Sequence, residues 1–259
     1  MKIFAVAVLL FFALWVRAGA ADPEPSPTPS ISIETGGSSD HLSNGKGDWN
    51  SSYITVVRQA APRRAIYAEL SNRLRFRQTD PLYTAGVYVP PSSNTILNIE
   101  ANLSPTHIVL PSVELIASLE HRLAYGWGYA VGLNDRAYTS LNVRGESLLI
   151  DRYWRTMRVA YKFSGVQLSN VTGSAVTHTL LFTRYYGIGQ LSQMTLSVNA
   201  GRDAENTGSA VLVSDVTGAN LNGAHWLGQN WALTWLLATT RQGTLYSRSG
   251  FQLGIRRRL

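Results

Sequence analysis

The sequence predicts an all-β fold, an antiparallel transmembrane β-barrel of the outer-membrane type with about 12–14 strands. Three observations predict it. The chain begins with an export signal. After that signal, no apolar run is long enough to cross a bilayer as a helix. Segments of about ten residues then recur in which large apolar side chains alternate with polar ones, as in strands with lipid on one side and water on the other.

The N-terminus predicts export. Met1 and Lys2 precede an unbroken apolar run, Ile3 to Val16, and small residues follow at Ala18–Ala21. A charged start, a short apolar run and a small-residue cleavage site form a secretory signal peptide, which we place at residues 1–20. The alternative is an uncleaved membrane anchor.

Proline-rich sequence follows the signal. Four of the ten prolines of the chain lie between Asp22 and Ser30. Proline favours the extended polyproline conformation and donates no hydrogen bond to a sheet, so residues 21–30 are predicted to be a periplasmic tether. The barrel is predicted to occupy residues 31–259.

The composition excludes some chemistry. The chain has no cysteine, so disulfides, thiolate metal sites and cysteine catalysis are excluded. Lys and Arg number 23 against 16 Asp and Glu, and removing Lys2 and Arg17 with the signal leaves 21 − 16 = +5. This modest excess suits anionic partners without selecting one.

Period-two alternation predicts which residues contact lipid. In the stretch Ala65–Gln78, Ile66, Leu70 and Phe76 share one parity and arginines share the other. Other strands of this kind are predicted within 112–123, 155–165, 190–201 and 230–240. By the same rule Leu196 and Leu233 are expected to contact lipid, while the neighbouring residues Ser197 and Thr234 are expected to line the lumen.

Turn residues and aromatic residues complete the prediction. Segments rich in Gly, Asn and Ser divide the chain into about fourteen strands, or twelve if Tyr83–Val89 is a loop. The six prolines outside the tether are expected between strands or at their edges. Seven Trp and twelve Tyr, many near strand ends, fit the aromatic girdles of a membrane barrel. A soluble β-sandwich is the alternative, but its strands are usually shorter.

Three segments resemble a known family. GGSSDHLSNGKGDW (Gly36–Trp49), NLSPTHIVLP (Asn102–Pro111) and DRYWRTMRVAYKF (Asp151–Phe163) resemble the YaiO family of outer-membrane β-barrel proteins. The likeness extends from about Ser30 to Leu259. It implies an outer-membrane barrel similar to the barrel portions of exopolysaccharide export porins, and it implies no established activity.

Basic residues on the predicted polar faces form the candidate site. We expect them to line the lumen and to pair there with carboxylates, because buried charges need partners. The basic residues are Arg73, Arg75, Arg77, Arg158, Lys162, Arg248, Arg256 and Arg258. The predicted acidic partners are Glu69, Glu114, Glu120 and Glu146.

Catalytic and metal sites are less favoured. His41 and Ser43 lie two residues apart, a spacing that a serine–histidine lipid hydrolase can use, but this segment also reads as a turn. His178 is a further candidate for a lumenal histidine. No metal-ligand spacing appears, so no metal and no cofactor are expected.

The sequence therefore predicts a protein of the Gram-negative outer membrane. The leading hypothesis is a passive pore or saccharide-export porin with a basic lumen, since rings of arginine favour anions. The alternatives are a non-conducting structural or surface-binding barrel and a lipid-modifying enzyme. Expected partners are outer-membrane lipid and lipopolysaccharide, the barrel-assembly machinery, and anionic or polar saccharides; no nucleic acid is expected.

Overall fold

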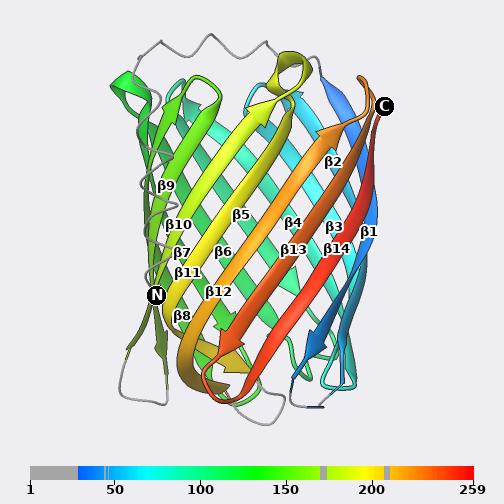
Figure 1. Cartoon of the computed structure of the whole chain (residues 1–259), viewed down its shortest axis with the longest axis vertical. Coiled ribbons are helices and arrows are strands. Elements are labelled where there is room, and N and C mark those ends of the chain that lie inside the picture. Colours follow the sequence, from blue (N-terminus) through cyan, green and yellow to red (C-terminus); the bar gives the residue numbers. More distant parts are fainter. Residues whose placement is uncertain (1–28, 44, 46, 170–173, 207–210) are drawn as a thin grey trace, which may run out of the picture.

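The computed structural model describes residues 29–43, 45, 47–169, 174–206 and 211–259. The predicted signal peptide and most of the predicted tether lie outside these residues. Fourteen antiparallel strands form one closed barrel, in which the first strand pairs with the last (Figure 1). The predicted fold class is confirmed, and so is the higher strand count, because residues 83–89 belong to a strand. None of the described residues forms a helix long and apolar enough to cross a membrane.

The strands vary in length from nine to sixteen residues. They are β1 (Ser30–Leu42), β2 (Trp49–Ala61), β3 (Arg64–Arg75), β4 (Gln78–Ser92), β5 (Thr95–Leu103), β6 (Val113–Arg122), β7 (Trp127–Ala137), β8 (Asn142–Trp154), β9 (Met157–Leu168), β10 (Ser174–Tyr186), β11 (Ser192–Asn206), β12 (Val211–Trp226), β13 (Trp231–Gln242) and β14 (Tyr246–Arg258). Two short 3-10 turns, η1 (Ala124–Gly126) and η2 (Ile188–Gln190), follow β6 and β10.

The lengths of the connections orient the barrel. An even number of strands places the beginning of β1 and the end of β14 at the same end of the barrel. The longest connections, residues 104–112 and 43–48, lie at the opposite end. Outer-membrane barrels have short periplasmic turns and longer extracellular loops. We therefore assign the end where β1 begins and β14 ends to the periplasm.

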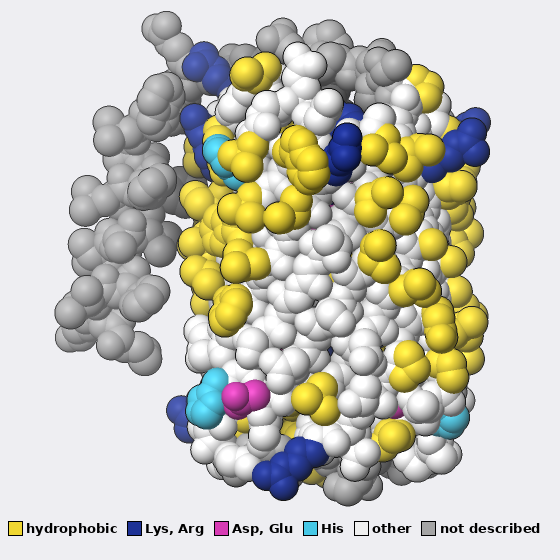
Figure 2. All heavy atoms as spheres, turned by 90° about the vertical axis from the view of Figure 1, so that its right-hand side faces the viewer, with side chains coloured by type: hydrophobic (Ala, Val, Ile, Leu, Met, Phe, Trp, Pro, Cys, Tyr) yellow, Lys and Arg dark blue, Asp and Glu magenta, His cyan; other side chains and the backbone are white. Residues whose placement is uncertain are grey.

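The strand register separates the two faces of the wall. Leu196 and Leu233 point outward and are 44% and 39% exposed, while Ser197 and Thr234 point inward. Figure 2 shows hydrophobic side chains spread over the outer wall and charged side chains gathered near its two ends. The predicted facing of these four residues is confirmed. Ser197 is only 6% exposed, so the lumen wall leaves little room around it.

Some residues differ from the predicted facing. Phe76 was predicted to contact lipid, but it lies in the turn after β3 with a positive φ of 51° and packs against Trp49 and Tyr246. The turn reverses the chain before the alternation reaches Phe76. His178 and Glu146 point outward and not into the lumen, because they pair in register with outward residues such as Phe163 and Leu133.

Three prolines lie inside a strand and not between strands. Pro81, Pro90 and Pro91 all belong to β4. Pairing of β4 with β5 begins only at Tyr83, so Pro81 has a ladder partner on one side alone. Pro90 and Pro91 lie where the register between β4 and β5 shifts. Proline is tolerated at such places because no ladder hydrogen bond is required of its nitrogen.

Candidate functional site

The lumen is the candidate site, and its charges are balanced. Nine described basic side chains and nine described acidic ones have inward parity. The basic ones are Arg73, Arg75, Arg122, Arg136, Arg158, Lys162, Arg248, Arg256 and Arg258. The acidic ones are Glu34, Asp40, Glu69, Asp80, Glu100, Glu114, Glu120, Asp151 and Asp203. The sequence predicted a basic lumen. The structure instead gives equal numbers, because only three of these nine carboxylates were among the predicted acidic partners.

The charges occupy one part of the circumference. All nine basic residues and eight of the acidic ones lie on the arc from β14 through β1 to β9. The inward described side chains of β10 to β13 are uncharged, with Asp203 as the exception. They include Thr177, Thr179, Gln193, Thr195, Asn199, Asn220, Asn222, Thr234, Thr240 and Gln242. We call these two parts of the lumen the charged arc and the neutral arc.

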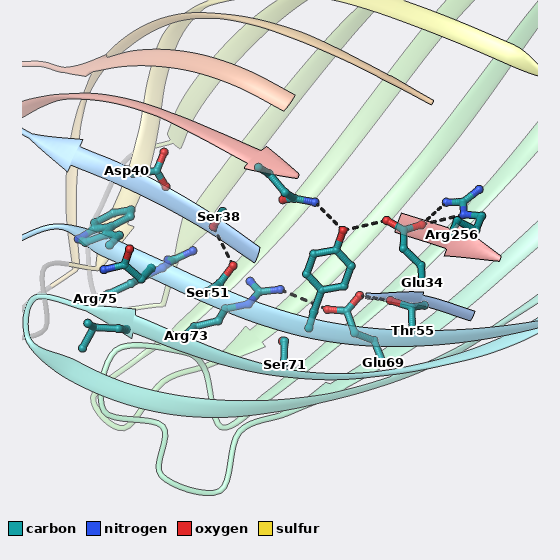
Figure 3. A pocket seen from close by; sticks show the side chains of 15 residues that line it. Glu34, Ser38, Asp40, Ser51, Thr55, Glu69, Ser71, Arg73, Arg75 and Arg256 are labelled. Carbon is teal, nitrogen blue, oxygen red and sulfur yellow. Dashed lines mark hydrogen bonds and ion pairs between the residues drawn. The ribbon is translucent and has the colours of Figure 1, made fainter. Parts of the chain in front are cut away.

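Glu34 connects the strands at the closure of the barrel. Its Oε2 accepts a hydrogen bond of 2.7 Å from Nε of Arg256, and its Oε1 accepts bonds of 2.8 Å from the hydroxyls of Tyr53 and Thr234. These partners come from β14, β2 and β13. Figure 3 shows Glu34 beside Arg256. A Cβ at Gly36 or Gly254 would lie 2.6 or 2.5 Å from the Tyr53 hydroxyl, so glycine makes room for this ring.

A second group of charges lies beside Glu34 on β2 and β3. Glu69 accepts a hydrogen bond of 2.9 Å from Thr55, and its other oxygen is 3.9 Å from Arg73 (Figure 3). Together with Arg75 and Arg256 these residues line a cavity of about 480 Å³ that opens into the lumen. The side chains of Arg73 and Glu69 are 34% and 25% exposed, so they are paired and still accessible to a solute.

An aromatic cluster with two guanidinium groups packed on it lies at the extracellular end of the barrel. The guanidinium carbons of Arg75 and Arg248 lie 4.7 and 4.8 Å from the ring centroid of Trp49, which is 4% exposed. The rings of Phe76 and Tyr246 contact Trp49 at 5.1 and 5.8 Å. Cation–π contacts hold both arginines in place without neutralising their charge.

A similar cluster lies at the periplasmic end. The Tyr153 ring is 4.2 Å from the guanidinium carbon of Arg122 and 5.4 Å from that of Arg158, and it stacks on Tyr185 at 6.2 Å. Asp151 is 3% exposed and accepts a hydrogen bond of 2.7 Å from Nε of Arg158. Glu120 forms an ion pair with Arg122. The lumen therefore has arginine–aromatic clusters at both ends.

The predicted site residues are thus partly brought together. Arg73, Arg75, Arg158, Lys162, Arg248, Arg256 and Arg258 point inward, as do Glu69, Glu114 and Glu120. Arg77 was predicted among them, but it lies in the turn between β3 and β4 with a positive φ of 64° and is exposed. The alternation of faces does not extend to Arg77, because the strand ends at Arg75.

Sequence reasoning missed several inward charges. Arg136 pairs with Glu114 at 3.8 Å, and Glu100 accepts hydrogen bonds from Tyr67 and Asn102. Asp151 was missed in the same way. Side chains alternate between the two faces of a strand, so the facing of one residue gives the facing of the others. For example, once Arg158 and Lys162 of β9 are placed inward, every second residue of β9 is expected to point inward too.

The extracellular mouth holds an inward-folded loop. Asp80 lies on the inward face of β4 and is 1% exposed. Its carboxylate accepts hydrogen bonds from the backbone N–H groups of Ile108, Val109 and Leu110 at 3.0, 2.7 and 2.9 Å, and one from the hydroxyl of Thr106. Residues 106–110 of the β5–β6 loop therefore lie against the lumenal side of β4 and narrow the mouth.

The candidate catalytic pair is not assembled. His41 points outward, and its Nδ1 lies 2.9 Å from Asp48. The Ser43 hydroxyl accepts a hydrogen bond of 2.9 Å from the backbone N–H of Ser247. The two side chains bond to different partners, so this geometry does not support nucleophilic catalysis.

Several solved structures are similar to this barrel. A bacterial polysaccharide outer membrane secretin matches with a TM-score of 0.60 and 9% identity, over 88% of this chain and 98% of that one. The KdgM porin matches with a TM-score of 0.48 and 11% identity, over 87% and 98%. An anion-selective porin from Comamonas acidovorans matches with a TM-score of 0.45 and 8% identity, over 90% and 100%. At these identities the likeness shows the fold alone.

The sequence comparisons identify the family. No curated protein matches the chain. The printed descriptions of these structures are those of porins and of an outer-membrane secretin. A model of the YaiO membrane beta barrel domain matches residues 31–206, and the chain belongs to this family.

Proposed function

We propose that this barrel is a passive outer-membrane conduit for polar saccharides. The observation that carries the proposal is the neutral arc, in which amide and hydroxyl side chains on β10 to β13 alternate with small or apolar ones such as Leu181 and Leu236. Amides and hydroxyls both donate and accept hydrogen bonds, as sugar hydroxyls do. A sugar moving along this wall therefore exchanges water for protein partners with little net cost.

The charged arc supports the same proposal. Its carboxylates and guanidinium groups are largely paired, as at Glu34 with Arg256 and at Asp151 with Arg158. Paired charges of equal number create a weak net field, so the arc offers hydrogen bonds without strongly selecting an ion. The similarity to a polysaccharide secretin fits this proposal. In this account the barrel is a conduit and not an enzyme.

Vesicle swelling tests this function. Vesicles that contain the barrel should swell when the outside solution holds a neutral trisaccharide such as raffinose. An Asn220→Leu, Asn222→Leu variant keeps the number and branching of the heavy atoms but removes two amides of the neutral arc, which are joined by a hydrogen bond of 3.0 Å. We expect its swelling rate to fall about fivefold, which corresponds to the loss of one hydrogen bond of roughly 1 kcal/mol between the solute and the wall.

The matched control lies between these two residues. Leu221 points outward at the same height, so Leu221→Met changes the same strand without touching the lumen. Its swelling rate should equal that of the unmodified barrel. Equal rates for all three proteins would show that the neutral arc does not contact the solute, and no swelling in any of them would remove the proposed function.

A further inference from the structure

The outward-facing charges are divided between the two ends of the barrel. Seven described arginines lie at the periplasmic end on the outer wall or in its turns. They are Arg58, Arg63, Arg64, Arg152, Arg155, Arg184 and Arg257. The outward or loop carboxylates among the described side chains, Asp48, Asp135, Glu146 and Asp215, all lie in the extracellular half. The periplasmic end of the outer wall is therefore rich in basic side chains, and no carboxylate side chain among the described residues faces outward there.

Two of these arginines belong to a patch with tryptophan. The guanidinium carbon of Arg152 is 5.1 Å from the ring centroid of Trp127 and 4.9 Å from that of Trp154. Met157 lies opposite Trp154 in register, and Arg184 lies opposite Met157, so Trp154 and Arg184 are at one level on β8 and β10. We call Trp127, Arg152, Trp154 and Arg184 the Arg–Trp patch.

Arg152 retains unused hydrogen-bonding capacity. Its Nε atom is buried and has no hydrogen-bond partner among the described residues. The two tryptophan rings hold the guanidinium group by cation–π contacts. Because Nε is buried, a phosphate outside the wall can be reached only by the two terminal NH2 groups. A guanidinium group held in this way matches the oxygens of a phosphate, to which arginine donates two parallel hydrogen bonds.

We propose that the Arg–Trp patch binds the phosphate headgroup of an anionic phospholipid in the periplasmic leaflet. The patch lies on the outer wall at the periplasmic edge of a band of apolar side chains, where we expect lipid headgroups to meet the barrel. Tryptophan and arginine both favour this level of a membrane. Because the patch points away from the lumen, a solute in the pore does not reach it.

Lipid retention tests the proposal. The purified barrel is equilibrated in mixed micelles with equal amounts of phosphatidylglycerol and phosphatidylethanolamine, and the bound lipids are counted by native mass spectrometry. The unmodified barrel should retain phosphatidylglycerol in preference. In an Arg152→Gln, Arg184→Gln variant, the ratio of bound phosphatidylglycerol to bound phosphatidylethanolamine should fall about fivefold for each arginine replaced. This is the usual contribution of a basic residue at an anionic surface.

The control comes from the opposite end of the same wall. Arg144 and Arg202 also point outward, but they pair with Asp135 and Asp215 at 3.5 and 3.8 Å. An Arg144→Gln, Arg202→Gln variant should keep the full preference. Equal preference in both double variants, or no preference in the unmodified barrel, would overturn the proposal and leave the patch as a surface for some other partner.

A charge-conserving variant covers the case in which the glutamine variant does not fold. Folding is checked by the change in gel migration on heating. An Arg152→Lys, Arg184→Lys variant keeps the charge but loses the paired donors of the guanidinium groups. Its preference for phosphatidylglycerol should therefore lie between that of the unmodified barrel and that of the glutamine variant. A lysine variant with no preference at all, although folded, would also contradict the proposal. None of these results depends on whether the lumen conducts.

Discussion

Replacing Asp80 with alanine should release the loop of residues 104–112 from the extracellular mouth. The carboxylate of Asp80 satisfies three backbone N–H groups of this loop, and two of their residues, Val109 and Leu110, are 3% and 6% exposed. An unsatisfied buried N–H costs about 1–3 kcal/mol. The loop escapes this cost by opening to water, so the loss is limited to the free energy of docking the loop, which is on the order of the 1–3 kcal/mol of one such group.

Thermolysin digestion measures this release, because the enzyme cleaves before large apolar residues such as Ile108, Val109 and Leu110. The variant should be cut in the loop while the barrel still shifts on a gel after heating. Asp80→Asn keeps one acceptor oxygen and should be cut at an intermediate rate. The control is Asp215→Ala, whose side chain is 83% exposed in a weak pair with Arg202. Resistance of the Asp80→Ala loop to thermolysin would contradict the anchoring role of the carboxylate.

A Leu196→Arg substitution should destabilise the barrel by about 2–4 kcal/mol in a bilayer, the cost of an arginine on the lipid face near mid-membrane. Leu196 points outward within the stretch Met194–Ala200 of β11, whose outward side chains are apolar, between Phe182 and Leu221 on the neighbouring strands. The long side chain cannot reach water without crossing apolar surface. The measurement is the free energy of unfolding in urea, with the protein folded into vesicles.

The matched control for Leu196→Arg is Asn220→Arg. Asn220 lies next to Leu221 and therefore at the same height, but it points into the lumen and is partly exposed. An arginine there reaches water in the pore, and the variant loses only the hydrogen bond with Asn222, about 1 kcal/mol. A loss as large as that of Leu196→Arg would show that the interior is packed and dry.

Period-two alternation predicted most of the fold from the sequence. The pattern gave the facing of Leu196, Leu233 and Thr234 because side chains alternate between the two faces wherever a strand pairs in regular register. The pattern failed at Phe76 and Arg77, where the backbone adopts positive φ angles. Neither residue type is typical of that conformation, so the sequence did not predict a turn there. Parity can be counted only while the strand continues, and the sequence does not show where a turn without Gly or Pro begins.

The candidate site was harder to predict for a different reason. Arginines spaced two apart, such as Arg73 and Arg75, stand out within one strand. Their partners lie on other strands: Glu34 meets Arg256 only because β1 closes onto β14. The contact of Asp80 with Val109 depends on how a long loop folds, and no local pattern contains that information. The balance of charge in the lumen is a property of all fourteen strands together.

Single-channel recording in planar bilayers tests the account most directly. A conduit with nine basic and nine acidic inward side chains among the described residues should carry an ohmic current, and its reversal potential in a salt gradient should show weak selectivity between K⁺ and Cl⁻. Arg73→Gln with Arg75→Gln should move that potential toward cation selectivity, whereas Arg77→Gln in the exposed turn should leave it unchanged. No current above that of the bare bilayer would contradict the account and favour a non-conducting structural barrel, and strong anion selectivity would contradict the balanced lumen.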